Sequence, residues 1–320
     1  MPYKFDPEVA EAMAPLMAIQ AQALPVAVHD VETRRKNFDF FLAAVVGSMP
    51  LAEGVTKEFF KTKTTDGHDL EMTWFSPTDA PASPGPALLH THGGGMILGS
   101  VTGFAPAIHN IVAESGVPML SVEYRYAPEH PHPTPLEDCY TGLIWLQDHA
   151  KELNVDPTRI GVIGESAGGG LAAGLALMAR DRKFSPPLAK QVLIYPMIDD
   201  RTTDGDKEML PFCIWSYEDN ITGWSALLGK DVIGTDKVSK YAAPARETDL
   251  SNLPPTYIDV GELDIFRGED IEYARKLAAA KVSTEFHLHP GCPHAFEALA
   301  PNSDVVKRAT TDRVRAIKSF

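Results

Sequence analysis

The pentapeptide Gly164-Glu165-Ser166-Ala167-Gly168 is the feature that most constrains this chain. An apolar run at residues 159–163 precedes it directly, and a helical stretch of small residues follows from 169 to 180. A serine between two glycines at a sharp turn from strand to helix is typical of a nucleophile elbow, whose strained backbone exposes the hydroxyl at the sheet edge. The alternative is a capping serine at a glycine-rich helix start. The flanking strand and helix favour Ser166 as a nucleophile.

Hydrophobic periodicity places this elbow in an α/β fold. Two helices and two antiparallel strands are predicted first, at residues 7–22, 31–46, 57–63 and 69–75. Short apolar runs then alternate with helical patterns and predict strands at 87–90, 118–122, 159–163, 191–195, 256–260 and 284–289. Such alternation is typical of a mostly parallel central sheet with helices on both faces.

The segment between the strands at 191–195 and 256–260 is too long for an ordinary connection. We expect an insertion with helices of its own, because it carries several large apolar side chains: Phe212, Trp215, Tyr217, Trp224 and Leu227. The N-terminal segment adds Phe38, Phe40 and Phe41. We therefore expect residues 1–50 and 199–245 to form a helical cap, and residues 51–198 and 246–320 to form the core beneath it. The cap should cover the carboxyl edge of the sheet, where open α/β sheets bind ligands.

The charge balance excludes some classes of partner. The formal net charge is −14, and no cluster of Lys and Arg offers a surface for nucleic-acid phosphates. Asp6, Glu8 and Glu11 lie where a signal peptide would be basic and apolar, and no segment is long and apolar enough to span a membrane. Three widely spaced cysteines fit reduced thiols better than a disulfide framework. We expect a cytoplasmic protein.

The glycine run in His92-Gly93-Gly94-Gly95 directly follows a predicted strand. Glycines allow backbone N–H groups to approach a substrate carbonyl that side chains would obstruct. We predict an oxyanion hole made by the N–H groups of Gly94, Gly95 and Ala167. A flexible loop is the alternative. Metal binding by the His-x-His pairs at 90/92 and 130/132 is rejected, because His90 belongs to a strand and His92 should hydrogen-bond the backbone beneath it.

Two further motifs, Glu123-Tyr-Arg-Tyr-Ala-Pro-Glu-His-Pro131 and Pro135-Leu-Glu-Asp138, complete a pattern that spans residues 87–296. The chain resembles the hormone-sensitive-lipase-like esterases of the α/β-hydrolase fold. This resemblance implies the fold, the cap, ester cleavage without metal or cofactor, Asp264 in Gly261-Glu-Leu-Asp264 as the acid, and His294 in Gly291-Cys-Pro-His-Ala-Phe296 as the base. Glu262 remains an alternative acid, because pleat alternation places it on the same side as Asp264.

The motifs together predict a serine carboxylesterase acting on small or medium acyl esters. A lactonase or amidase would use the same triad, and a non-catalytic small-molecule receptor or a water-eliminating enzyme could share the fold. We name Met96, Phe212 and Trp215 as substrate contacts; Met96 stands where the family often has an aromatic residue. The predicted partner is a small-molecule ester, and a homodimer is the assembly that we consider.

Overall fold

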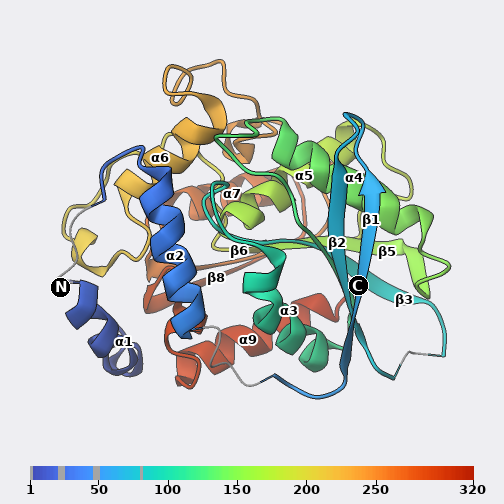
Figure 1. Ribbon diagram of the computed structural model, residues 1–320, viewed down its shortest axis with the longest axis horizontal. Helices are drawn as coiled ribbons and strands as arrows, with labels where there is room; N and C mark the ends of the chain where they lie inside the picture. The colour runs from blue at the N-terminus through green and yellow to red at the C-terminus, as the bar shows by residue number, and fades with distance from the viewer. Residues whose placement is uncertain (1–2, 21–25, 46–50, 80–81) are drawn as a thin grey trace.

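The computed structural model describes residues 3–20, 26–45, 51–79 and 82–320. Its centre is an eight-stranded sheet in the order β1-β2-β4-β3-β5-β6-β7-β8 (Figure 1). β2 runs antiparallel to β1 and β4, and the remaining neighbours are parallel. The strands are β1 (Val55–Lys63), β2 (Asp69–Pro77), β3 (Gly85–Thr91), β4 (Met119–Val122), β5 (Val155–Glu165), β6 (Lys190–Ile194), β7 (Thr256–Leu263) and β8 (Thr284–Pro293).

Helices cover both faces of this sheet (Figure 1). α3 (Val101–Ser115) and α9 (Asp304–Ile317) lie on one face, and α4 (Thr134–Asp148), α5 (Ala167–Asp181) and α7 (Arg267–Ala279) lie on the other. Consecutive strand residues alternate between the two cores: Leu88 packs with α3, whereas Leu89 packs with α4 and α5. This alternation follows from the two-residue period of a strand. The predicted mostly parallel sheet with helices on both faces is confirmed.

The inserted segment holds α6 (Tyr217–Leu228) and two short 3-10 helices, η2 (Leu210–Phe212) and η3 (Pro244–Arg246). The N-terminal helix α2 (Val31–Val45) lies beside α6 in Figure 1. Arg34 Nε in α2 is 2.7 Å from Asp219 Oδ1 in α6, and the backbone N–H of His29 donates to Thr222 Oγ1 at 2.9 Å. Two segments that are distant in the sequence therefore contact each other, as expected.

The first helix, α1 (Pro7–Gln20), packs elsewhere. Val9 and Met13 are buried against residues 292–309, which include the short helix α8 (Phe296–Leu299) and the start of α9. The backbone N–H of Asp6 donates to Gly291 O at 2.9 Å. This part of the N-terminal segment therefore supports the loop that follows β8, whereas α2 contacts the insertion.

Some of the large apolar side chains that we expect to pack in the cap are buried, and others are not. Tyr217, Trp224 and Leu227 are buried, and Phe38 stacks on Phe104 with ring centroids 6.4 Å apart. Phe40 is 75% exposed, so its predicted packing is wrong. Two residues correspond to about 200° of rotation on an α-helix, so Phe40 points away from the buried face that carries Phe38. The side chain of Phe41, and the ends of the predicted helices at residues 21–22 and 46, lie outside the described residues.

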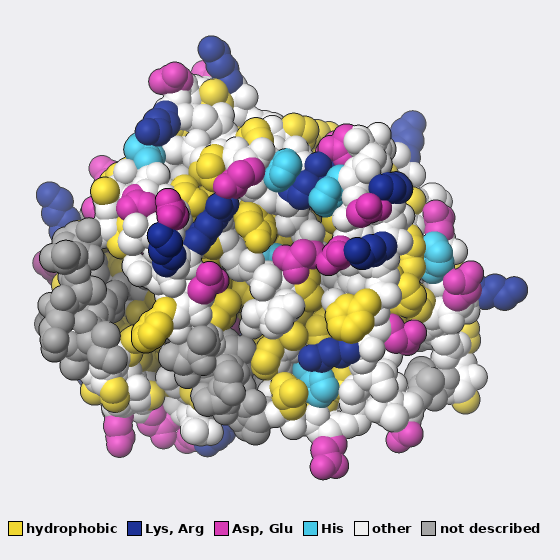
Figure 2. Space-filling view, viewed as in Figure 1, with side chains coloured by type: hydrophobic (Ala, Val, Ile, Leu, Met, Phe, Trp, Pro, Cys, Tyr) yellow, Lys and Arg dark blue, Asp and Glu magenta, His cyan; other side chains and the backbone are white. Residues whose placement is uncertain are grey.

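Figure 2 shows basic and acidic side chains interspersed over the face drawn. Within the described ranges, we find no helix with the length and apolar character that membrane crossing requires.

Candidate active site

Ser166 lies at the sharp turn between β5 and α5, with φ 56° and ψ −121°. This left-handed backbone is strained for a residue with a side chain. A Cβ at Gly164 would lie 2.4 Å from the backbone of Gly168, and one at Gly168 would lie 1.9 Å from Thr91 O. Both glycines are therefore required by close backbone approach. The serine hydroxyl is presented at the carboxyl end of β5, as the sequence predicted.

Three distant stretches of chain meet at this serine. His294 Nε2 is 3.0 Å from Ser166 Oγ, and His294 Nδ1 is 2.6 Å from Asp264 Oδ2. Asp264 follows β7 and His294 follows β8, so parallel strands bring all three side chains to one edge. The side chains of Asp264 and His294 are 0% and 9% exposed, which limits competition from water. This geometry can transfer a proton from the hydroxyl to the imidazole.

The two candidate acids, Asp264 and Glu262, make different contacts. Asp264 reaches the imidazole, and its second oxygen accepts a hydrogen bond from Phe266 N at 3.0 Å. Glu262 Oε2 instead accepts from Gly291 N at 2.8 Å. Glu262 therefore supports the loop that leads to His294, and the structure does not place it on the imidazole.

The glycine run forms a tight turn beside the elbow. Gly94 and Gly95 have φ values of +123° and +60°, and the N–H groups of Ile97 and Leu98 both donate to Gly94 O, at 3.1 and 3.0 Å. A Cβ built on the preceding glycine, Gly93, would lie 3.5 Å from Ser166 Cβ. Across the described residues, no acceptor takes the N–H groups of Gly94 and Gly95. These groups can therefore donate to a substrate oxygen.

The buried imidazole of His92 forms a hydrogen bond with the backbone of this turn. Its Nδ1 donates to Gly93 O at 2.8 Å, as predicted, and its ring stacks on Tyr124 with centroids 4.3 Å apart. Complete burial lowers the pKa of His92 to about 4, although the bond to Gly93 O opposes that change. The imidazole is therefore neutral at physiological pH.

Sequence reasoning missed two sets of neighbours. Glu165, next to the nucleophile, receives both of its contacts from His90 Nε2, at 3.0 and 3.1 Å. Burial, the largest single influence, raises the pKa of Glu165, but His90, a backbone hydrogen bond and His92 together oppose it, and the net shift is downward. Tyr195 and Phe266 place their ring edges against the His294 imidazole, with centroid distances of 4.6 and 5.3 Å. The His90-Thr-His92 spacing is a sequence signal for the His90 contact alone, and the contacts of Tyr195 and Phe266 have none.

The three predicted substrate contacts have different surroundings. Trp215 lies directly on the glycine turn at residues 93–98, the predicted oxyanion turn, because a Cβ at Gly95 would be 2.4 Å from its ring. Phe212 packs edge-on against Phe5 with centroids 5.0 Å apart. Met96 is 1% exposed and belongs to the main core. The structure brings Trp215 to the site, and substrate contact by any of the three stays a prediction.

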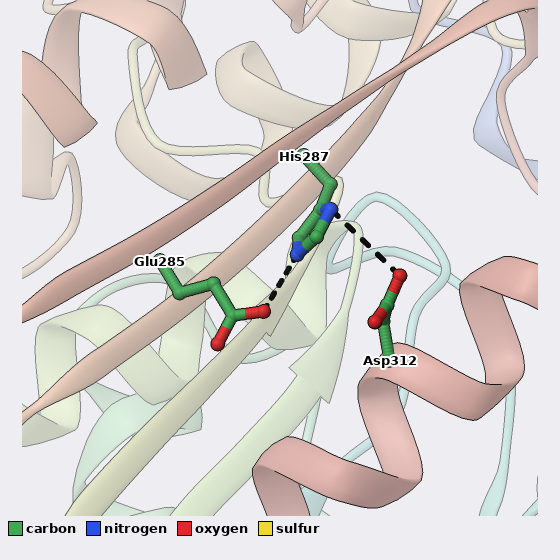
Figure 3. A group of neighbouring side chains, drawn as sticks. All are labelled: Glu285, His287 and Asp312. Carbon is green, nitrogen blue, oxygen red and sulfur yellow. Dashed lines mark hydrogen bonds and ion pairs between the residues drawn. The ribbon is translucent and has the colours of Figure 1, made fainter.

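A group that resembles a metal site lies at the far end of β8 from His294. Within the described ranges, Glu285, His287 and Asp312 are close enough to be considered as ligands. Figure 3 shows the two carboxylates approaching different ring nitrogens: Glu285 Oε1 is 2.6 Å from Nε2, and Asp312 Oδ2 is 3.8 Å from Nδ1. Arg315 also pairs with both carboxylates. These contacts favour a surface ion-pair network over a metal centre.

Comparison with known proteins agrees with this fold and geometry. A family model described as alpha/beta hydrolase fold matches residues 88–298. The carboxylesterase NlhH of Mycobacterium tuberculosis is 34% identical over 241 residues, which cover 73% of each chain. The ethyl acetate hydrolase of Pseudomonas putida is 29% identical over 285 residues, or 86% of each chain. A solved structure of a bacterial heroin esterase aligns with a TM-score of 0.87 at 36% identity, covering 98% of this chain and 97% of that one.

The elbow, the relay and the eight-stranded sheet define a hydrolase class that uses an activated serine. The chain belongs to the α/β-hydrolase family, and its predicted resemblance to the hormone-sensitive-lipase-like esterases is confirmed.

Proposed function

We propose that this chain is a serine carboxylesterase with Ser166 as nucleophile, His294 as base and Asp264 as the orienting acid. The observation that carries the proposal is the unbroken relay, with 3.0 Å between hydroxyl and imidazole and 2.6 Å between imidazole and carboxylate. The enzyme hydrolyses carboxylic ester bonds, as its relatives' names state for them.

The reaction proceeds through an acyl-enzyme. His294 Nε2 accepts the hydroxyl proton while Ser166 Oγ attacks the ester carbonyl, and Asp264 stabilises the imidazolium. The N–H groups of Gly94, Gly95 and Ala167 donate hydrogen bonds to the carbonyl oxygen, on which negative charge develops. Each such donor can lower the activation free energy by about 3 kcal/mol. Collapse breaks the bond to the alcohol, which takes the proton from His294. Water, activated by the same imidazole, then releases the acid and restores Ser166.

Contacts of the insertion support a preference for short acyl groups. The Trp215 ring lies on Gly95, and a Cβ at Gly223 of α6 would be 2.7 Å from Gly95 O. The insertion at residues 199–245, with α2 beside it, thus acts as a cap that limits the space above the oxyanion turn. The name of the Pseudomonas putida relative, an ethyl acetate hydrolase, is consistent with small substrates. We expect kcat/KM for butyrate esters to exceed that for palmitate esters.

The test compares wild type with Ser166→Ala on p-nitrophenyl butyrate. The wild type should give a burst and be labelled by a fluorophosphonate, whereas the variant should lose labelling and nearly all turnover. Full activity in the variant would refute the role of Ser166. Tight ligand binding by an unlabelled wild type would favour the receptor alternative instead.

Lactones, amides and water elimination are the remaining alternatives for this site. Values of kcat/KM for matched ester, lactone and amide substrates, with product analysis, separate them. The cytoplasmic location and the homodimer stay predictions, for which fractionation and sedimentation are the measurements.

A further inference from the structure

The motif at residues 123–131 forms hydrogen bonds with the oxyanion turn and its flanking residues, although the catalytic steps above do not use it. Glu123 Oε2 accepts a hydrogen bond from Val101 N at 2.8 Å, just after the turn. Tyr124 OH donates to His92 O at 2.7 Å, and Ala127 N donates to Met96 O at 2.9 Å. Hydrogen bonds therefore hold residues 92–101 to this motif at His92, Met96 and Val101.

Arg35 of α2 joins the same arrangement from the N-terminal segment. Its Nε donates to Ile97 O at 2.7 Å, and its Nη2 donates to Ala127 O at 3.0 Å. Its two Nη atoms each lie 2.7 Å from a different oxygen of Glu129. The guanidinium also lies 5.5 Å from the Tyr126 ring centroid. Such a planar fork binds both oxygens of one carboxylate and two carbonyls at fixed angles, a geometry that a lysine ammonium does not offer.

The preceding residue has a different role. Arg34 pairs with Asp219 of the insertion, and its Nη1 donates to Ala27 O and Asp30 O. Two consecutive arginines of α2 thus contact two parts of the molecule: Arg34 the inserted segment and Arg35 the backbone of the oxyanion turn.

We propose that Arg35 is a positioning residue that couples α2 to the oxyanion hole. It holds the carbonyl of Ile97, whose own N–H donates to Gly94 O, so the turn from Gly94 to Ile97 is fixed at both ends. The N–H groups of Gly94 and Gly95 are thereby aimed before negative charge develops. Because oxyanion donors act mainly in the transition state, loss of Arg35 should lower kcat more than it weakens substrate binding. This inference rests on the proposed esterase function.

The decisive variant is Arg35→Met, which removes the guanidinium and retains an unbranched stem. We expect kcat for p-nitrophenyl butyrate, per fluorophosphonate-titrated site, to fall about tenfold while KM changes less than about twofold. The Ki of a trifluoromethyl ketone, which binds as a tetrahedral adduct, should rise in parallel with the loss of kcat/KM.

Chemical rescue gives a readout that a purely structural role would not move. Arg35 lines a cleft of about 420 Å³ together with Tyr126 and Glu129, so a small cation can reach the vacated position. Millimolar guanidinium should restore part of the kcat of Arg35→Met, and an equal concentration of sodium should not. The matched control is Lys36→Met. Among the described residues Lys36 forms an ion pair with Glu32 alone, through side chains that are 72% and 80% exposed, so this variant should keep wild-type kcat.

The proposal is overturned if Arg35→Met keeps wild-type kcat per titrated site, or if it loses only thermal stability. Should that variant not fold, Glu129→Gln tests the same fork, because the Glu129 side chain is 54% exposed and tolerates replacement. A smaller fall in kcat at unchanged KM supports the proposal, and unchanged kcat contradicts it. A wild type that neither labels nor turns over would instead refute the esterase function itself.

Discussion

At the scale of single residues, Asp264 and Glu262 provide an internal comparison of two nearby carboxylates. Asp264→Asn should lower kcat by about 10⁴, because an amide favours the wrong imidazole tautomer and cannot stabilise the imidazolium. Glu262→Gln should keep kcat within about threefold, since its contact is Gly291 N rather than His294. Steady-state kinetics on p-nitrophenyl butyrate make the comparison. Equal losses in the two variants would show that the acid has been assigned wrongly.

His92 gives a prediction for pH. Its folded-state pKa of about 4 lies below the ordinary value of 6.5, so the unfolded chain binds the proton more readily. The associated stability is present above pH 6.5 and is lost as the pH falls towards 4, by up to about 3 kcal/mol. Urea unfolding of wild type and His92→Asn from pH 4 to 7 measures it.

The variant should show a shallower decline of unfolding free energy with acid, because it lacks the titrating ring. His68→Gln, in an exposed turn, is the matched control and should retain the wild-type slope. Identical slopes in wild type and His92→Asn would contradict the assignment.

The residues that sequence could predict are those with local signatures. Ser166, Asp264 and His294 each lie in a short motif beside a strand, so their meeting at one sheet edge could be anticipated. Tyr195 and Arg35 have no such signature. Their partners, His294 and Ile97, lie 99 and 62 residues away, and only the packing of distant elements reveals them.

At the scale of elements, α6 and the oxyanion turn are in direct contact. A Cβ at Gly223 would lie 2.7 Å from Gly95 O, whereas one at Gly268 in α7 would meet nothing within 4 Å. Gly223→Ala should therefore displace the turn, lowering both kcat and the melting temperature despite the better helix propensity of alanine. Gly268→Ala should keep wild-type kcat and gain up to about 1 kcal/mol of stability.

Differential scanning calorimetry and steady-state kinetics on both variants test this pair. If Gly223→Ala is as stable and active as Gly268→Ala, α6 does not constrain the turn. The same contact explains why helix patterning alone could not place α6: its sequence predicts a helix, but the glycine that faces Gly95 is recognisable only once the cap and core are together.

At the scale of the whole molecule, the sheet could be anticipated better than the layout of the cap. Parallel strands were predicted from apolar runs because each is buried on both faces. The sequence predicts one N-terminal part of the cap, yet α1 supports the loop after β8 while α2 contacts α6. Both helices carry apolar residues, and periodicity does not specify which surface each will cover.

A buried ion pair joins the C-terminal helix α9 to the central sheet. Arg313 of α9 donates from Nε to Asp259 Oδ2 at 2.6 Å and from Nη2 to Oδ1 at 3.0 Å, and the Asp259 side chain in β7 is 0% exposed. Arg313→Met should lower the free energy of unfolding by about 3 kcal/mol, because it leaves a buried carboxylate without its counter-charge. Arg308→Met, on the exposed face of the same helix, should change it by less than about 0.5 kcal/mol. Urea denaturation followed by circular dichroism measures both variants, and equal midpoints would show that this ion pair does not anchor α9 to the sheet.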